Sequence, residues 1–258
     1  MSNRDQDYMR YGAGVAHAGV AGIDEGLRAY MLRVYNYMAI GLAITGLVAI
    51  VVAMNVVSDT PTQYALRNGQ FLTSFGYMLY ASPLKWVVML APLGMVFFLS
   101  ARIGKMTVSG AQMAFWVFAG LMGLSLSSIF LVYTGQSISR VFFITAASFG
   151  GLSLFGYTTK RDLSGWGSFL FMGLIGIILA SIVNIFVGSS ALTFAISVIG
   201  VLVFAGLTAY DTQMIKQMYY EADSSDVAGR KAIMGALKLY LDFINLFIML
   251  LQLFGNRN

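Results

Sequence analysis

Two acidic residues interrupt the apolar part of the sequence, and acids in such a setting are the first candidates for chemistry. Asp211 lies near the end of a long uncharged stretch, and Asp242 lies inside the last apolar segment. A charged side chain near the centre of a bilayer costs from about 3 kcal/mol upward, so an acid there is a functional candidate by default. Asp242 lies nine residues beyond Ile233. That distance is about 13 Å along a helix, so we expect Asp242 near the middle of the membrane.

A polar stripe runs along the last apolar segment and contains Asp242. Its members follow each other at spacings of 4, 3, 4 and 3 residues: Lys238, Asp242, Asn245, Met249 and Gln252. On a helix these positions fall within about 80° of one face, and Lys238 and Asp242 form an i, i+4 pair. Such a face lines a water-filled route through a helix bundle, or it forms a satisfied network that only fixes packing. Both interpretations are open.

Asp211 and Asp242 would make a proton-dependent gate if the fold brought their carboxyl groups together. Two carboxylates in a poorly solvated site do not easily both ionise, so they share a proton and titrate as one unit. The shared proton would hold two helices together, and its loss at higher pH would separate them or recruit a cation. Arg102, at the inner end of the second expected helix, is a candidate latch that could clamp one carboxylate.

The composition indicates which kind of fold must position these residues. Of the 258 residues, 58% are hydrophobic and 10% are charged, and the mean hydropathy is +0.76. Soluble domains average roughly 45–50% and about 25%, and they need charged residues to cover their surface. These values exclude an ordinary soluble enzyme, a disordered chain and a disulfide-rich secreted module. The absence of cysteine and the single histidine, His17, exclude thiolate and histidine-cluster metal sites.

Stretches without charge predict an all-α, polytopic membrane protein with seven transmembrane helices. The expected spans are 34–58, 86–101, 111–133, 141–159, 166–187, 191–210 and 232–254. We expect residues 1–27 to form a flexible cytoplasmic tail and residues 28–256 to form one membrane domain. The most polar stretch, 217–231, is the loop before the last span.

The basic residues predict the orientation, because Lys and Arg gather in cytoplasmic loops. If the amino terminus is inside, twelve of the sixteen basic residues lie in inner segments: Arg4, Arg10, Arg28, Arg33, Arg102, Lys105, Lys160, Arg161, Lys216, Arg230, Lys231 and Lys238. The other four lie outside: Arg67, Lys85, Arg140 and Arg257. We therefore expect a cytoplasmic amino terminus and an external carboxyl terminus. A last helix that re-enters without crossing is the alternative.

Four segments of the sequence resemble the Bax inhibitor-1 family, also called the transmembrane Bax inhibitor motif family, in its bacterial branch. They are LRAYMLRVYNYMAIGLAITG (27–46), GYTTKRDLSGWGSFLFMGLIG (156–176), GLTAYDTQ (206–213) and GALKLYLDFINLF (235–247). The resemblance implies a bundle of six helices around a central carboxyl-terminal helix, in the bacterial inner membrane.

The resemblance also implies a function. Bacterial members are described as pH-sensitive calcium leak channels, in which two aspartates and an arginine of the second helix form the gate. Asp211 and Asp242 match the two aspartates directly, whereas Arg102 matches only through its spacing from Lys105. The second helix here carries no acid, where some relatives have one, so any site that needs that carboxylate is in doubt.

We therefore expect a cation leak with calcium as the permeant ion, no resident metal or cofactor, and the lipid bilayer as its partner. The main alternative is a regulatory membrane protein that modulates a membrane protease, a secretion complex or a stress response without conducting ions. The resemblance supports it, because the family also includes members linked to membrane protease regulation and to stress survival. Two further alternatives are weaker. An intramembrane aspartyl protease would explain Tyr210-Asp211 but not the Leu-Tyr-Leu before Asp242. A retinal-type receptor would need an acid in the third span, which has none. We expect no enzymatic activity and no nucleic-acid partner.

Overall fold

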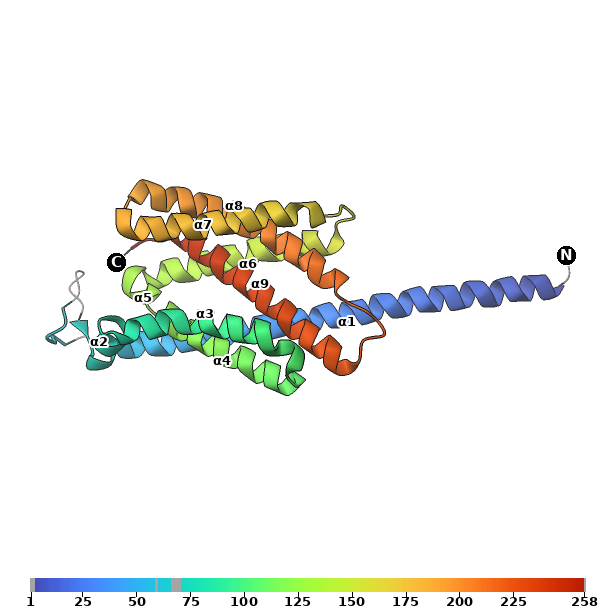
Figure 1. The fold of residues 1–258 in the computed structure, drawn as a ribbon, viewed down its shortest axis with the longest axis horizontal. Coiled ribbons are helices and arrows are strands. Elements are labelled where there is room, and N and C mark those ends of the chain that lie inside the picture. Colours follow the sequence, from blue (N-terminus) through green and yellow to red (C-terminus); the bar gives the residue numbers. More distant parts are fainter. Residues whose placement is uncertain (1–2, 59, 66–70, 258) are drawn as a thin grey trace.

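The computed structural model describes residues 3–58, 60–65 and 71–257, with side chains from Glu25 onward. Seven of its helical segments are long and apolar enough to cross a membrane (Figure 1). They are Glu25–Val56, Leu84–Lys105, Val108–Val132, Gly135–Thr158, Ser164–Val187, Ser190–Gln217 and Ser225–Phe254. Each of them overlaps one of the seven expected spans, so the prediction of an all-α polytopic membrane protein is confirmed.

The regular secondary structure of the described residues consists of helices and one short pair of strands. The helices are α1 (Asn3–Val56), α2 (Ser74–Tyr80), α3 (Leu84–Arg102), α4 (Val108–Leu126), α5 (Ile129–Val132), α6 (Gly135–Thr158), α7 (Gly167–Val187), α8 (Ser190–Gln217) and α9 (Ser225–Phe254). The 3₁₀ turns η1 (Ile103–Lys105) and η2 (Ser164–Trp166) precede α4 and α7. Strands β1 (Val57–Ser58) and β2 (Phe71–Leu72) pair antiparallel in the loop between α1 and α2.

Short polar residues start several of the spans. In four spans the side chain of the N-cap residue accepts a hydrogen bond from a backbone N–H in the first turn. These N-cap residues are Thr107 of α4, Thr134 of α6, Ser189 of α8 and Ser224 of α9. A capping oxygen satisfies one of the N–H groups that a helix leaves unpaired at its start. At the other end of α7, Gly188 has a φ of 64°, a left-handed conformation that suits glycine and lets the chain turn into α8.

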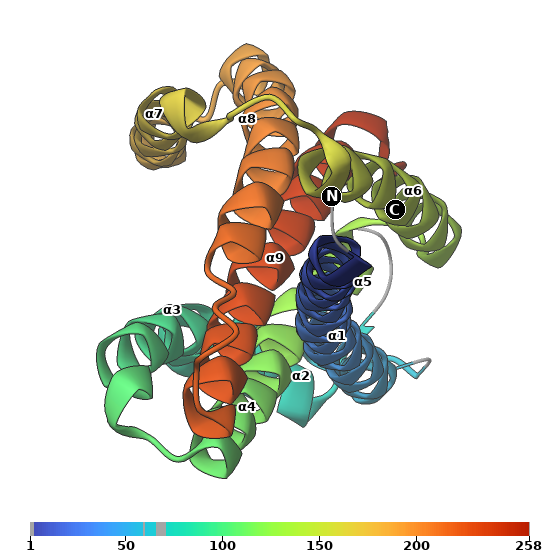
Figure 2. The same ribbon diagram turned by 90° about the vertical axis from the view of Figure 1, so that its right-hand side faces the viewer.

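Helix α9 forms the centre of the bundle. In its most apolar window 72% of the residues are buried, compared with 11–33% in the other six spans. It packs against α8, α1, α6 and α4, whereas α7 lies at the outside and packs against α8 (Figure 2). Tyr240 of α9 is fully buried against Phe115 and Phe118 of α4, and its hydroxyl lies 2.7 Å from Thr45 Oγ1 of α1. The prediction of a central carboxyl-terminal helix is confirmed.

The loops between the spans separate into two ends. The turns after α3, α6 and α8 lie at the end from which α1 extends toward the amino terminus, and the carboxyl terminus lies at the opposite end (Figure 1). Helix α9 is continuous over its 30 residues, from Ser225 to Phe254. The described chain therefore has seven spans with its two termini at opposite ends, as the expected orientation requires. Which end is cytoplasmic stays a prediction.

The amino-terminal segment differs from the expected tail. Helix α1 begins at Asn3 and continues without a break into the first span, so residue 27 is not a helix boundary. The physical reason lies in the sequence, which has no proline before Pro61 to stop the helix. The side chains of residues 1–24 lie outside the described part of the structure, and the flexibility expected for residues 1–27 stays a prediction.

Candidate functional site

A partly open cavity of about 570 Å³ lies between α7, α8 and α9. Its polar lining comes mostly from the last two spans, and it includes Asp211 and Tyr210 of α8 and Lys238, Asp242 and Asn245 of α9. The apolar walls come from two helices: Phe171 and Leu174 of α7, and Phe204 and Leu207 of α8. The fold therefore places both predicted aspartates in one cavity.

The two carboxyl groups line the same cavity from the facing sides of α8 and α9, close enough for each to affect the ionisation of the other. Asp242 is the more deeply buried, at 5% exposure, and its Oδ2 atom has no hydrogen-bond partner in the described chain. A buried carboxylate oxygen without a donor is costly, because nothing replaces the water it has lost. The arrangement is thus suited to holding a proton.

Lys238 supplies the nearest positive charge, and it pairs with Asp211. Its Nζ lies 3.6 Å from Asp211 Oδ1, and the Lys238 side chain is 45% exposed. The sequence pairs Lys238 with Asp242 by their i, i+4 spacing, whereas the structure turns the lysine toward the neighbouring helix. The site therefore holds two acids and one base. Within the described residues, no three His, Cys, Asp or Glu side chains gather in a metal-binding group.

Close contact between α8 and α9 brings the aspartates together. A Cβ atom at Gly200 of α8 would lie 2.6 Å from Met249 Sδ, and one at Gly235 of α9 would lie 2.9 Å from Ile215 Cγ2. In lipid, where the hydrophobic effect cannot drive association, such small residues let helices approach closely. Along α8, Asp211 lies between Gly200 and Ile215, the two residues of this helix that make these contacts.

The polar stripe of α9 faces α8 along its length, but its members have different partners. Asn245 lines the cavity, and its Nδ2 donates a hydrogen bond of 2.8 Å to the carbonyl of Leu241 on its own helix. Gln252 lies three turns beyond Asp242, where its Oε1 accepts a hydrogen bond of 2.7 Å from Ser197 Oγ of α8. One part of the stripe thus lines the cavity, and Gln252 fixes packing.

Arg102 does not occupy the place of a latch in this structure. It is exposed at the end of α3 and does not line the cavity. Helix α3 packs on α4, at the opposite edge of the bundle from α7 and α8 (Figure 2). Arg102 therefore lies outside the cavity of the acids, and Lys238 is the base beside them. The spacing of Arg102 and Lys105 could not show this, because it says nothing about which side of the bundle α3 covers.

Comparison with known proteins settles the family. Residues 27–258 match the family described as "Inhibitor of apoptosis-promoting Bax1". The chain belongs to the Bax inhibitor-1 family. The resemblance that the four sequence segments indicate is therefore confirmed.

The relatives extend over almost the whole chain. An uncharacterized protein of Rickettsia prowazekii is 50% identical over 234 residues, which cover 91% of this chain and 92% of the relative. The "Inner membrane protein YbhL" of Escherichia coli is 47% identical over 234 residues, 90% of this chain and 93% of its own. An uncharacterized membrane protein of Streptococcus pyogenes is 32% identical over 237 residues, 91% of this chain and 96% of its own. The chain is a multi-pass membrane protein, and its similarity to YbhL supports the inner membrane as its location.

Two polar contacts of this Bax inhibitor-1 family member are not predicted from the sequence. Gln213, two residues after Asp211, binds the loop between α6 and α7: its Oε1 accepts from Leu163 N at 2.7 Å, and its Nε2 donates to the Arg161 carbonyl at 2.8 Å. On the same part of α8, Thr212 Oγ1 lies 2.9 Å from Ser153 Oγ of α6. The run Asp-Thr-Gln at 211–213 is the available signal, because three polar residues in succession interrupt an otherwise apolar helix.

The loop that Gln213 holds borders the cavity through Ser164. The Ser164 hydroxyl and its backbone N–H, which donates to Asp162 Oδ1 at 2.9 Å, hold the pKa of the exposed Asp162 carboxyl below its ordinary value. Hydrogen bonds to the ionised form have this effect. Asp162 thus stays charged at neutral pH and accepts a hydrogen bond from the loop at the mouth of the cavity.

Proposed function

We propose that the protein is a pH-sensitive cation leak, with calcium as the permeant ion and the Asp211–Asp242 pair as its gate. The observation that carries the proposal is the meeting of two carboxyl groups from consecutive spans in one cavity, where Asp242 Oδ2 has no donor. In this proposal the protein catalyses no reaction and holds no resident cofactor or metal.

The gate would work through charge balance. With one proton shared between the acids, the site carries one negative charge, which Lys238 balances at 3.6 Å from Asp211. Loss of that proton at higher pH leaves two negative charges and one positive charge between α8 and α9. The uncompensated charge repels the helices from each other or attracts a cation, and oxygen ligands of this kind suit calcium.

Calcium flux across liposomes tests this gate. The purified protein is reconstituted with a calcium-sensitive dye inside the vesicles, and the leak is recorded from pH 5 to pH 8. We expect the wild-type leak to rise with pH. Asp242→Ala and Asp211→Ala remove the shared hydrogen bond, so at low pH they should raise the leak about tenfold, since a hydrogen bond to a charged group contributes about 1.5–3 kcal/mol.

The conservative variants separate charge from hydrogen bonding. Asp242→Asn keeps a hydrogen-bond donor at every pH, so its leak should lose the dependence on pH. Asp226→Asn is the matched control, because it removes an exposed carboxylate from the first turn of the same helix. Wild-type leak rates and pH dependence in Asp211→Asn and Asp242→Asn would exclude the pair as the gate. Absence of flux in the folded wild-type protein would contradict conduction and favour the regulatory alternative.

A further inference from the structure

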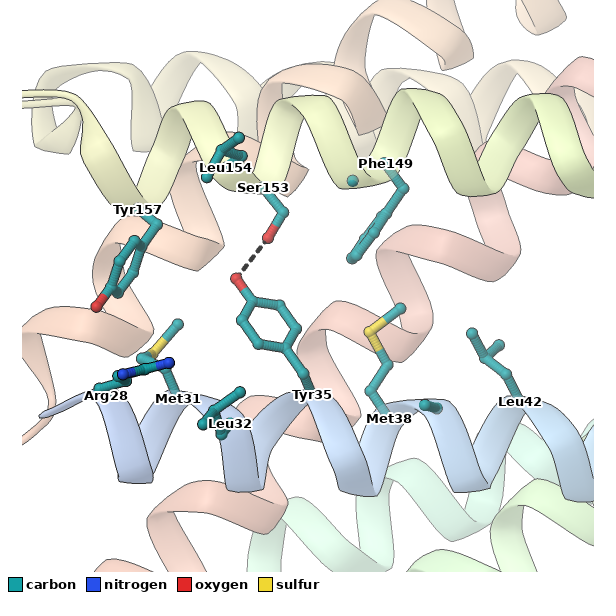
Figure 3. Close-up of a pocket in the computed structure, with 12 residues that line it drawn as sticks. Arg28, Met31, Leu32, Tyr35, Met38, Leu42, Phe149, Ser153, Leu154 and Tyr157 are labelled. Atoms are coloured by element: carbon teal, nitrogen blue, oxygen red, sulfur yellow. Dashed lines mark hydrogen bonds between the residues drawn. The ribbon is translucent and has the colours of Figure 1, made fainter. Parts of the chain in front are cut away.

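A second, larger groove lies on the side of the bundle away from α7, between α1 and α6. Its volume is about 820 Å³, and its walls are mainly apolar (Figure 3). Apolar side chains of both helices line it: Met31, Met38 and Leu42 of α1 and Phe149 of α6. The lining also includes Arg28 of α1 and Tyr157 of α6. None of these residues lines the cavity of Asp211 and Asp242.

We propose that this groove binds one phospholipid, with the phosphate at Arg28 and an acyl chain along α1 toward Leu42. The groove is polar at one end and apolar at the other. Figure 3 shows Arg28 and Tyr157 together at one end, and Leu42 and Phe149 toward the other. A phospholipid has the same division between an anionic head and an apolar tail.

The polar end carries positive charge. Arg28 is exposed, and no side chain in the described part of the chain forms an ion pair with it. Lys216 donates a hydrogen bond of 2.9 Å to the Tyr157 carbonyl, and its Nζ lies 5.2 Å from the centre of the Tyr157 ring. A guanidinium group offers a planar set of donors that matches the oxygens of a phosphate, and the neighbouring lysine adds to the attraction.

The length of the groove suits one leaflet of the bilayer. Arg28 and Leu42 are fourteen residues apart in α1. This separation corresponds to about 21 Å along the helix. Half of a bilayer with its headgroup layer is about 20–22 Å thick. A phosphate at Arg28 would therefore leave the acyl chain enough groove to reach the middle of the membrane.

The hydroxyl groups midway along the groove already have partners. The Tyr35 hydroxyl lies 2.7 Å from Ser153 Oγ (Figure 3). Ser153 Oγ in turn lies 2.9 Å from Thr212 Oγ1 of α8. An occupant next to these groups need not supply hydrogen bonds, which favours a hydrocarbon chain over a polar molecule. Thr212 follows Asp211 in the chain, so an effect of the lipid on ion flux would rest on the proposed function, whereas binding would not.

Gly150 offers a way to close the groove without disturbing the bundle. It lines the groove, and a Cβ atom there would meet no heavy atom within 4 Å. Gly150→Leu therefore fills the groove with a side chain. Gly176→Leu is the matched control, because Gly176 lies on α7, is exposed and also has open space around its Cβ position.

Photolabelling in vesicles tests the proposal. The full-length protein is reconstituted in phosphatidylethanolamine and phosphatidylglycerol that includes phosphatidylglycerol with a diazirine on one acyl chain. Labelled peptides are then identified by mass spectrometry. We expect the label to concentrate in residues 28–42 and 149–157. Gly150→Leu should reduce this label about tenfold, the effect of losing contacts to about two methylene groups. Gly176→Leu should leave it unchanged.

The headgroup is tested with a second pair of variants. Arg28→Gln should lower the labelling by phosphatidylglycerol in the groove, while Arg33→Gln, an exposed charge on the same helix, should not. Label spread evenly over the exposed faces of α1, α6 and α7, with no response to Gly150→Leu, would overturn the proposal. So would equal losses in Gly150→Leu and Gly176→Leu. Labelling requires no ion flux, so its failure is distinct from failure of the proposed function.

Discussion

At the scale of single residues, the balance of charge between Asp211, Asp242 and Lys238 is the feature on which the proposed gate depends. Asp242 is enclosed, and one of its oxygens lacks a donor, while Asp211 has the ammonium group of Lys238 beside it. A cation close to a carboxyl pair favours its ionised form. Lys238 is therefore expected to set the pH at which the pair loses its shared proton.

Replacement of Lys238 by methionine should raise the pH at which the calcium leak opens. Without the cation the pair keeps its proton longer as the pH rises, so the midpoint of the calcium leak should increase. Because the Lys238 side chain is 45% exposed, water screens its charge, so we expect a smaller increase than a fully buried cation would produce. Liposome flux from pH 5 to pH 9 measures the midpoint. Lys105→Met, at an exposed base in η1, should leave it in place, and an unchanged or lower midpoint in Lys238→Met would contradict the role of the lysine.

At the scale of the helices, close packing holds α8 at the distance that the site needs. Helix α8 lies between α6 and α9, and glycines mark both interfaces. A Cβ atom at Gly156 of α6 would lie 2.2 Å from the Ala209 carbonyl oxygen, two residues before Asp211. This neighbour is backbone, so it cannot move aside by changing rotamer. The position of Asp211 therefore depends on the absence of a side chain at Gly156.

Gly156→Ala should destabilise the protein and disturb the site. Inserting one methyl group into such a contact forces the helices apart, at a cost of about 1–3 kcal/mol. The thermal unfolding midpoint in detergent measures the loss. Gly151→Ala is the control on the same helix, because a Cβ atom there would meet nothing within 4 Å, and alanine is the better helix former. Equal unfolding midpoints for the two variants would show that the α6–α8 contact does not require glycine at this position.

At the scale of the whole molecule, the orientation in the membrane decides from which side the cavity meets its protons. The turns after α3, α6 and α8 share one end of the bundle with most of the loop lysines and arginines, and the carboxyl terminus lies at the other end (Figure 1). Basic loops stay in the cytoplasm, so the end near the α8–α9 loop is expected to be cytoplasmic.

Introduced cysteines test this orientation directly, because the natural chain contains none. Gln136→Cys, exposed at the start of α6, should react with a membrane-impermeant maleimide in cells whose outer membrane has been made permeable. Ser225→Cys, exposed at the start of α9, should react only after the inner membrane is also opened. The unmodified chain gives the background signal. The reverse pattern would place the amino terminus outside and would contradict the positive-inside prediction.

Local features of the sequence are enough to predict a seven-span membrane protein, to indicate the family it resembles, and to single out Asp211 and Asp242 as the candidate acids. These conclusions follow from local properties, because a charge-free stretch must be a helix to satisfy its backbone in lipid, and an acid inside it stands out. The polar stripe of the last span is also local, since it depends only on helical periodicity.

Tertiary structure alone decided which groups meet. It turned Lys238 toward Asp211, left Arg102 exposed and outside the cavity, and joined Gln213 to the loop at Arg161 and Leu163. Contacts between helices depend on which faces pack and how closely, and small steric details such as the missing side chain of Gly156 control both. Spacing along one helix carries no information about the neighbouring helix, and so the partners of these polar groups emerge only when the bundle is assembled.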